Sequence, residues 1–315
     1  MTSNLAKSIE DPRGCRLCPR ACGADRSRPE RSDGFCRAGS QIYVARAAAH
    51  FWEEPCLSGQ RGSGTVFFSG CSLGCVFCQN REISRPSPGR PLPGKPVSPG
   101  RLAEIFLELQ ERGVHNINLV TPSHFAPQIA AALRQARRLG LILPVVYNSG
   151  GYDRPETLAL LDGQVNIYLP DFKYWSGELA GRYSKAPDYP AAARQAIAEM
   201  YRQVGPPRFD SQGMMTGGLM VRLLLLPGCL EDAKAVLSYL FSTYANGIFY
   251  SVMNQYTPPP SADLAPYPEL SRPVASWEYE ALLDYAEELG IENAFIQEGG
   301  AVSESFIPAF DGSGL

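Results

Sequence analysis

From residue 64 onward, short apolar runs alternate with segments whose apolar residues have helical spacing. Continuous apolar runs bounded by turn residues predict buried strands. The predicted strands cover residues 65–69, 117–121, 144–148, 165–171, 220–226, 247–254 and 293–297. Ser98 and Pro99 form a capping pair that opens a helix after the first strand. Further predicted helices cover residues 127–140, 155–162, 190–204, 230–244 and 277–290.

This alternation predicts an α/β fold of parallel β-α units with right-handed crossovers. A partial (β/α)6 TIM-like barrel is the natural closure of such units. Residues 79–97, which are rich in proline, are expected to form an irregular connection. Residues 205–218 contain two prolines and several glycines. Long loops of this kind are often functional lids, so we expect a mobile loop over the barrel mouth, with a disordered segment as the alternative.

The composition describes an ordinary globular protein of 315 residues, with 44% hydrophobic residues and a formal net charge of -3. The sequence has no excess of basic residues, so nothing in its charge indicates a nucleic-acid partner. The polar residues 1–8 lack an apolar secretory core, and Arg222 and Pro227 interrupt the longest apolar stretch, so no membrane segment is expected. Nine cysteines without an export signal favour metal ligation over disulfides, which indicates a reducing cytoplasm.

Three of these cysteines, Cys71, Cys75 and Cys78, follow the first predicted strand directly, with spacings of three and two residues. A tight loop with this spacing can bind one cubane iron–sulfur cluster and leave its fourth iron without a protein ligand. Fully ligated clusters take four cysteines, so an open iron is a site for chemistry. The alternatives are three unrelated buried thiols, or a structural zinc site with a fourth ligand from elsewhere. The position at a strand end favours the cluster, because barrel enzymes place their active sites on the loops after the strands.

With Phe77 directly before its third cysteine, the motif resembles that of the radical S-adenosylmethionine (SAM) superfamily. Over nearly the whole chain the sequence is similar to proteins related to pyruvate formate-lyase activating enzyme, within a branch that carries an N-terminal cysteine module. The segments that carry this similarity include residues 52–55, 62–65 and 78–80. The resemblance implies a partial barrel, a [4Fe-4S] cluster and SAM.

Polar residues follow the other predicted strands, where a barrel would build its pocket. In the activating enzymes an Asp-x-Lys pattern contacts SAM, and Asp171 and Lys173 match it. Residues at i and i+2 share one face of a strand, so this pair could meet the amino-acid end of SAM; a solvated ion pair is the alternative. The resemblance and the strand ends together give the candidate SAM contacts, which are Phe77, Thr121, Ser123, Asn148, Asp171, Lys173, Arg222 and Gln255.

The second predicted strand departs from the superfamily pattern. Many members carry Gly-Gly-Glu there to hold the amino group of SAM, whereas this chain has Thr121 and Ser123, which would supply hydroxyl or backbone oxygens instead. His124 beside them is interpreted as a contact to SAM or substrate, or as a helix cap. On the sixth strand the histidine of the activating enzymes is absent, and Gln255 lies nearby.

The resemblance implies reductive cleavage of SAM to a 5′-deoxyadenosyl radical, which abstracts hydrogen from a substrate. A protein or peptide is the expected substrate, with a glycyl radical on a partner enzyme as the guess from the family, and a flavodoxin- or ferredoxin-type protein as the electron donor. Two alternatives stay open: radical modification of a small molecule, and a non-catalytic iron–sulfur protein that transfers electrons. Cys229, at the end of the fifth strand, is a candidate hydrogen-atom donor to a substrate radical.

A second group of cysteines, Cys15, Cys18, Cys22 and Cys36, lies in the N-terminal part. Four thiolates satisfy tetrahedral Zn²⁺ completely, and they would equally hold a second iron–sulfur cluster that relays electrons to the first. No strand precedes this group, so it is not the radical SAM site. We therefore expect a cysteine-rich module and connector over residues 1–60 and a core over residues 61–315 with a C-terminal extension.

Overall fold

The computed structural model describes residues 13–85, 91–259, 264–296 and 307–315. These residues contain a ten-stranded sheet in the order β10-β9-β8-β6-β5-β4-β2-β1-β3, with β7 paired to β8. The strands from β2 to β10 along this order are parallel to their neighbours. The sheet is curved but not closed, which confirms the α/β fold with a partial barrel.

The parallel strands match the predicted positions within a few residues. They are β2 (Ser63–Phe68), β4 (Ile117–Val120), β5 (Val145–Ser149), β6 (Ile167–Pro170), β8 (Met215–Leu224), β9 (Phe249–Met253) and β10 (Ala294–Ile296). Residue 297, the predicted end of the last strand, lies outside the described residues, as do residues 1–8 of the polar amino terminus. Strands β2, β4, β5 and β6 are buried along their whole length, as parallel strands covered on both faces require.

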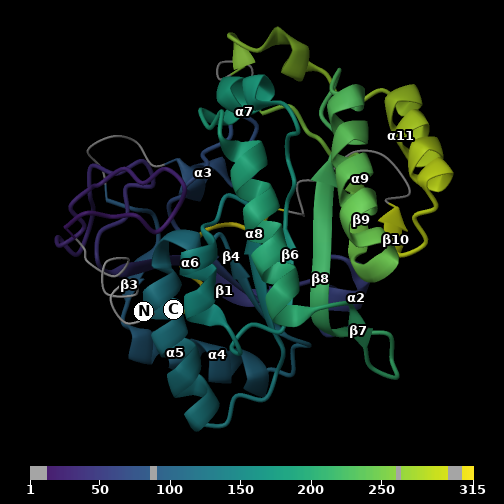
Figure 1. Ribbon diagram of the computed structural model, residues 1–315. Coiled ribbons are helices and arrows are strands. Elements are labelled where there is room, and N and C mark those ends of the chain that lie inside the picture. The colour runs from purple at the N-terminus through teal and green to yellow at the C-terminus, as the bar shows by residue number, and fades with distance from the viewer. Residues whose placement is uncertain (1–12, 86–90, 260–263, 297–306) are drawn as a thin grey trace.

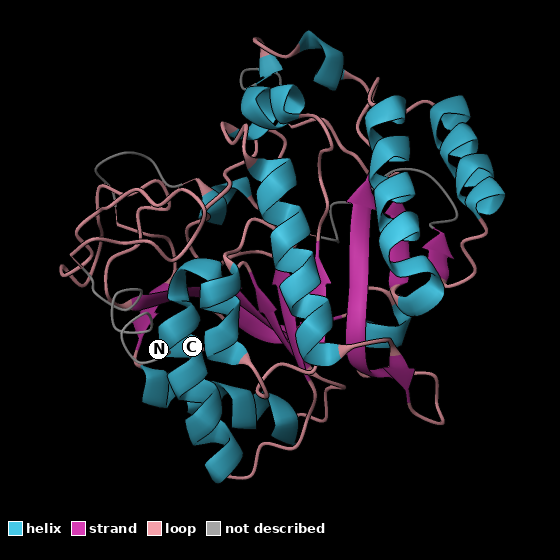
Figure 2. Ribbon diagram, viewed as in Figure 1, coloured by secondary structure: helices cyan, strands magenta, loops and turns pink. Residues whose placement is uncertain are grey.

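Amphipathic helices cover the outer face of the sheet (Figures 1 and 2). The main ones are α4 (Pro99–Glu111), α5 (Ala126–Arg138), α8 (Tyr189–Val204), α9 (Leu230–Tyr244) and α11 (Ser276–Leu289). The capping prediction at the first of them is confirmed, since the Ser98 side chain accepts a hydrogen bond from the Arg101 amide at 3.1 Å. The predicted helix over 155–162 is α6 (Pro155–Leu158) followed by a 3₁₀ turn, η2 (Ala159–Leu161).

The structure adds elements that the sequence patterns did not predict. Strand β1 (Ile42–His50) pairs antiparallel with β2 and with the short β3 (Lys95–Val97). Residues 79–97, expected to be irregular, contain β3 and α3 (Arg81–Ser84), and α2 (Pro55–Ser58) and α7 (Gly177–Ser184) are further short helices. The division of the chain at residue 60 stays a prediction, although β1 belongs to the main sheet.

The expected lid over 205–218 is wrong. Strand β7 (Arg208–Phe209) pairs antiparallel with the first residues of β8 and forms a hairpin. The Phe209 ring packs on Phe249 at the start of β9, with ring centroids 5.7 Å apart. The hairpin therefore lies at the amino ends of the parallel strands, away from the cysteine loop at their carboxyl ends (Figure 1). Gly213 lies in the hairpin turn, Gly205 caps α8, and Gly217 and Gly218 lie within β8.

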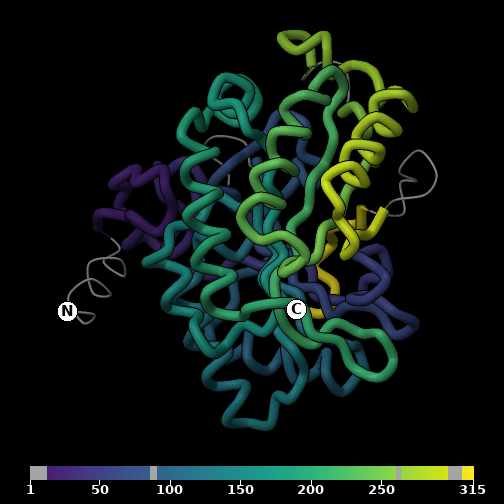
Figure 3. The backbone as a smooth tube through the Cα atoms, turned by 45° about the vertical axis from the view of Figure 1, so that its right-hand side comes forward, coloured from purple at the N-terminus to yellow at the C-terminus, as the bar shows by residue number. Residues whose placement is uncertain are grey.

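The N-terminal cysteine module is a coil without helices or strands among its described residues 13–41. It packs on one side of the barrel (Figure 3). At the other end of the chain, residues 309–313 lie along β1, where the Ala47 amide donates to the Ser313 carbonyl at 3.0 Å and Arg46 pairs with Asp311 at 3.0 Å. No helix in the described part of the chain is long and apolar enough to cross a membrane.

Candidate functional site

A cavity of about 230 Å³ opens at the carboxyl ends of the parallel strands. The three loop cysteines and all eight predicted SAM contacts line it, which are Cys71, Cys75, Cys78, Phe77, Thr121, Ser123, Asn148, Asp171, Lys173, Arg222 and Gln255. These residues come from the ends of β2, β4, β5, β6, β8 and β9. Because parallel strands end at one edge of the sheet, the fold brings together residues that are up to 184 positions apart (255 − 71).

The cysteine loop presents its sulfur atoms to hydrogen-bond donors. The Leu73 and Gly74 amides donate to Cys71 Sγ at 3.3 and 3.5 Å, and the Ser184 hydroxyl lies 3.0 Å from Cys75 Sγ. Hydrogen bonds to sulfur are among the features that tune iron–sulfur clusters. Cys78 Sγ has a similar partner in the Ser84 hydroxyl at 3.3 Å.

Burial raises the pKa of the Cys71 thiol to about 12, with the neighbouring Cys78 and Cys75 adding to the shift. Thiols crowded in this way become thiolates when a positively charged metal centre supplies the compensating charge. No three Cys, His, Asp or Glu side chains among the described residues converge on a single metal ion. A cubane cluster does not require such convergence, because each thiolate binds a different iron. The donor set therefore fits a [4Fe-4S] cluster.

Phe77 is held in place by three tyrosines. Its ring makes edge contacts with Tyr174, Tyr183 and Tyr256, with centroids 6.2–6.5 Å apart. Lys173 Nζ lies 6.0 Å from the centroid of the same ring. This packing fixes the last turn of the cysteine loop against the barrel wall.

A chain of ion pairs crosses the cavity. Lys173 Nζ lies 2.6 Å from Asp171 Oδ2, the other Asp171 oxygen lies 3.2 Å from Arg222 Nε, and Arg222 lies 3.1 Å from Glu53. Arg222 also donates to Asn148. The four charged side chains are at most 19% exposed, so Asp171 and Lys173 form a mostly buried pair rather than a solvated one.

The charged groups in this series of ion pairs shift one another's pKa values. Burial alone would raise the pKa of Asp171, but Lys173 and Arg222 outweigh it and hold that pKa below its usual value. Burial opposes the charge of Arg222, yet the surrounding carboxylates Glu54, Asp171 and Glu53 raise its pKa. Asp171 and Arg222 are therefore charged at neutral pH.

Sequence reasoning missed Glu53, which lines the cavity and pairs with Arg222, 169 positions later in the chain. Its Oε1 also accepts hydrogen bonds from Asn118 at 2.9 Å and Asn148 at 3.4 Å. The signal was present, because Glu53 lies in the segment 52–55 that carried part of the family resemblance. That resemblance gave the segment no role.

Two predicted residues lie elsewhere. His124 is fully buried outside the cavity lining, and its Nε2 lies 2.7 Å from the Ser69 carbonyl, so it links the loop after β4 to the end of β2. Burial lowers the pKa of His124 to about 3. Cys229 is the residue before α9 and does not line the cavity; its role as a hydrogen-atom donor stays a prediction.

Thr121, at the end of β4, has a φ of 59°, the left-handed region that favours glycine. This is the strand end where the superfamily pattern has glycines. A non-glycine residue held there costs about 1–3 kcal/mol, and a β-branched one is an outlier.

We expect Thr121→Gly to raise the stability of the protein by about 1 kcal/mol, because removal of the Cβ relieves this strain. Thr121→Ala is the matched control, since it keeps the Cβ and should bring no such gain. Thermal unfolding of the three proteins measures the effect. Equal melting temperatures for the Gly and Ala variants would contradict it.

The N-terminal cysteines also gather. Cys15, Cys18 and Cys36 are buried and Cys22 is exposed. Burial raises the pKa of Cys18, and its neighbour Cys36 adds to the shift, followed by smaller contributions from Cys15 and Cys22. Arg26 is 3% exposed, donates to the Gly39 carbonyl at 2.9 Å and lies 3.7 Å from Cys15 Sγ.

The module contacts the cysteine loop of the barrel directly. Arg20 donates to the Ser72 and Leu73 carbonyls at 2.8 and 3.2 Å. The close approach at Gly70 leaves no room for a side chain, because a Cβ there would lie 2.5 Å from the Cys36 carbonyl oxygen. One ligand candidate of the module therefore touches the residue directly before Cys71.

Residues 65–221 match the family model described as Radical SAM superfamily. Protein MJ0674 of Methanocaldococcus jannaschii is 29% identical over 291 residues, which are 91% of this chain and 78% of that protein. Among solved structures, SuiB of Streptococcus suis bound to S-adenosylmethionine has a TM-score of 0.48 and 12% identity, with 75% of this chain and 49% of SuiB covered. Methylornithine synthase (PylB) has a TM-score of 0.41 and 16% identity, with 68% and 58% covered. The chain thus spans about half the length of the solved structures it matches.

Proposed function

We propose that this chain is an enzyme that cleaves SAM reductively and acts on a protein or peptide, and the match of residues 65–221 to the Radical SAM superfamily model supports this proposal. The observation that carries the proposal is the single cavity lined by the three loop cysteines and all eight predicted SAM contacts. A protein that only carried electrons would need no such set of polar groups around its cluster. Activation of a glycyl radical enzyme, as in the pyruvate formate-lyase activating enzymes, is the family-based form of this proposal.

Cys71, Cys75 and Cys78 would hold a [4Fe-4S] cluster, whose open iron would take SAM. When bound, these groups supply the chemistry: one electron cleaves SAM to methionine and a 5′-deoxyadenosyl radical, which takes a hydrogen atom from the substrate. The residues of the chain would bind and orient SAM and exclude water from it. Asp171 and Lys173 present a carboxylate and an ammonium, the complements of the amino and carboxylate groups of SAM. Arg222 holds Asp171 in position through an ion pair and Asn148 through a hydrogen bond.

The experiment that tests the proposal is anaerobic reconstitution with iron and sulfide, reduction, and quantification of 5′-deoxyadenosine formed from SAM. Deoxyadenosine formation supports the radical SAM reaction. A loaded and reducible cluster that yields none, with and without candidate protein partners, would favour an electron-transfer protein. A partner whose addition increases turnover would identify the substrate.

We further propose that the N-terminal cysteines hold a second iron–sulfur cluster rather than zinc. The contact between Cys36 and Gly70 supports this choice, because it gives a short path from the module to the residue before Cys71. Seven arginines and three acidic residues lie between residues 13 and 37. Arg26 is buried, but the other six arginines are exposed or partly exposed and outnumber the acidic residues. This surface beside the exposed Cys22 suits an acidic flavodoxin- or ferredoxin-type electron donor.

Under this proposal we expect the reconstituted protein to contain about eight irons and the Cys18→Ser variant about four, because each cubane cluster holds four irons. The variant should still cleave SAM with a strong chemical reductant and should lose most turnover with a protein donor. Iron and zinc counts on the same samples measure the first effect. One zinc and about four irons per wild-type chain would overturn the second cluster.

A further inference from the structure

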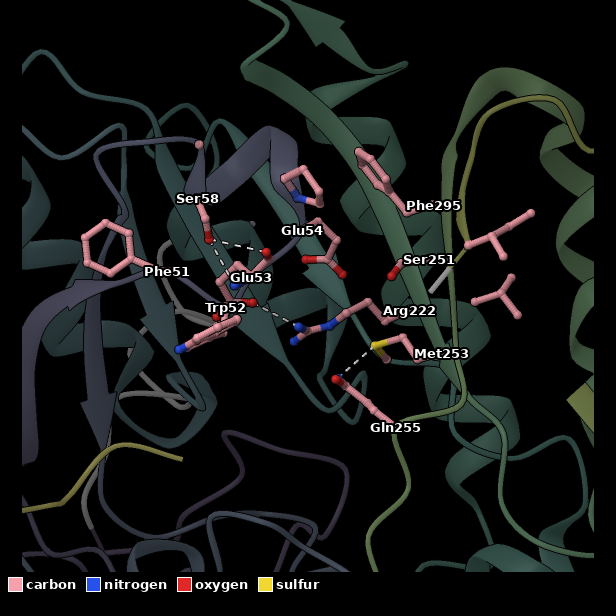
Figure 4. Close-up of a pocket in the computed structure, with 14 residues that line it drawn as sticks. Phe51, Trp52, Glu53, Glu54, Ser58, Arg222, Ser251, Met253, Gln255 and Phe295 are labelled. Atoms are coloured by element: carbon pink, nitrogen blue, oxygen red, sulfur yellow. Dashed lines mark hydrogen bonds and ion pairs between the residues drawn. The ribbon is translucent and has the colours of Figure 1, made fainter. Parts of the chain in front are cut away.

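A second cavity, of about 580 Å³, lies beside the candidate SAM cavity. Five residues line both, which are Trp52, Glu53, Arg222, Met253 and Gln255. The ion pair between Glu53 and Arg222 therefore forms part of a shared wall. The remaining lining comes from residues 51–59 on one side and from β9 and β10 on the other (Figure 4). This volume is within the range of small-molecule sites.

Glu54 lies in this second cavity without a complete set of hydrogen bonds. Its side chain is buried, and its Oε2 has no hydrogen-bond partner among the described residues. Figure 4 shows the carboxyl group near Ser251 and Arg222, between Trp52 on one side and Phe295 on the other. A buried polar atom without a partner costs about 1–3 kcal/mol, and such atoms in native structures call for an explanation. A donor on a bound ligand would remove this cost.

The buried carboxyl groups around Glu54 outnumber the cations. Three carboxyl groups, on Glu53, Glu54 and Asp171, face two cations, on Arg222 and Lys173. Both cations already contact carboxylates, since Arg222 pairs with Glu53 and Asp171 and Lys173 pairs with Asp171. No cation among the described residues lies within ion-pair distance of Glu54, although Arg222 is near enough to oppose the rise that burial causes in the pKa of Glu54. The cavity thus has one carboxyl group in excess.

The rest of the second cavity is largely apolar. Phe51, Trp52 and Ile296 are each about half exposed, and Phe295 also lines the cavity. Exposed large apolar side chains gathered at one cavity mark a binding surface. Aromatic rings also attract cations, so they suit a ligand with an apolar stem and a positive end.

We propose that the second cavity binds the substrate through a cationic group, an amine or guanidinium on an apolar stem, with the Glu54 carboxylate as its partner. A lysine or arginine side chain of a peptide has this chemistry. The inference rests on the proposed function only in naming the ligand a substrate. The shared wall would place the stem of the ligand next to the cavity that receives SAM.

Equilibrium dialysis of the reconstituted full-length protein in the presence of SAM tests the proposal. The two probes are Nα-acetyl-lysine amide and Nα-acetyl-norleucine amide, of which only the lysine probe has a charged end. We expect the lysine probe to bind at least tenfold more tightly than the norleucine probe. Glu54→Gln should remove this preference and leave the affinity for the norleucine probe within twofold, which shows that the cavity is intact. The matched control is Glu231→Gln, whose exposed carboxylate lies on α9 outside both cavities.

Equal affinities of the wild-type protein for the two probes, or an equal loss of both in Glu54→Gln, would overturn the cation site. n-Butylamine distinguishes the source of the amine: weaker binding than the lysine probe supports a peptide, and equal binding assigns the site to a small amine. 5′-Deoxyadenosine is measured on the same samples. Preference for the lysine probe without SAM cleavage would support the cation site and refute the proposed enzymatic activity. SAM cleavage without this preference would refute the cation site alone.

Discussion

Cys75→Ala should abolish both the cluster and the cleavage of SAM. Cys75 lines the cavity, is 6% exposed, and its sulfur has a direct hydrogen-bond partner in Ser184. Loss of a partner outside the ligand shell typically costs about 10–100-fold in metal affinity or activity, so loss of a ligand should reduce turnover by more than about 100-fold. Iron content, visible absorbance and 5′-deoxyadenosine, measured after anaerobic reconstitution, give the result.

Cys56→Ala is the matched control for this prediction. Cys56 is also a buried thiol, and burial raises its pKa to about 12, but it packs against Leu57, Val146 and Ile167 outside the cavity. We expect Cys56→Ala to retain iron and turnover and to lose only about 1 kcal/mol of stability through the small void. Turnover retained in Cys75→Ala would refute the ligand assignment.

Arg222→Gln should cause a large loss of stability. Arg222 lies between Glu53, Asp171 and Asn148, and its removal leaves the buried side chain of Glu53 without its cation, whereas Asp171 keeps Lys173. Breaking a buried pair in this way typically costs about 3–5 kcal/mol. Burial raises the pKa of the nearby Glu54 and Arg222 opposes this rise, so without Arg222 the pKa of Glu54 should rise further above its unfolded value. The variant then loses stability at high pH and regains part of it as the pH falls and Glu54 becomes protonated.

Thermal unfolding at pH 8 and pH 5 measures both parts of this prediction, and the deficit relative to wild type should be smaller at pH 5. Arg182→Gln is the control, because Arg182 pairs with Glu269 at 2.8 Å but is 44% exposed. Exposed pairs contribute about 0–1 kcal/mol, so its melting temperature should change little. Similar losses in the two variants would show that the buried chain of ion pairs is no more important than a surface pair.

The sequence predicted the parts of this protein that depend on local patterns. Apolar runs and helical spacing located the seven parallel strands and the main helices, because each element must bury its own apolar face whatever its neighbours are. Ser98 predicted the start of its helix because its capping hydrogen bond joins residues only three positions apart in the sequence. The predicted site residues line one cavity for a related reason: in a parallel sheet every strand ends at the same edge, so residues such as Cys71, Asp171 and Arg222 must gather there once the strands are known.

Only the tertiary structure decided features that depend on pairing between distant segments. The alternation of elements does not say that β1 adds an antiparallel edge, that residues 208–217 form a hairpin at the amino ends of the strands, or that Cys36 packs on Gly70. Glu53 and Glu54 are adjacent in sequence, yet one pairs with Arg222 and the other lies unpaired in a separate cavity. That difference depends on where residues 51–59 cross the open side of the barrel, which is fixed by long-range packing and leaves no periodic signal in the sequence.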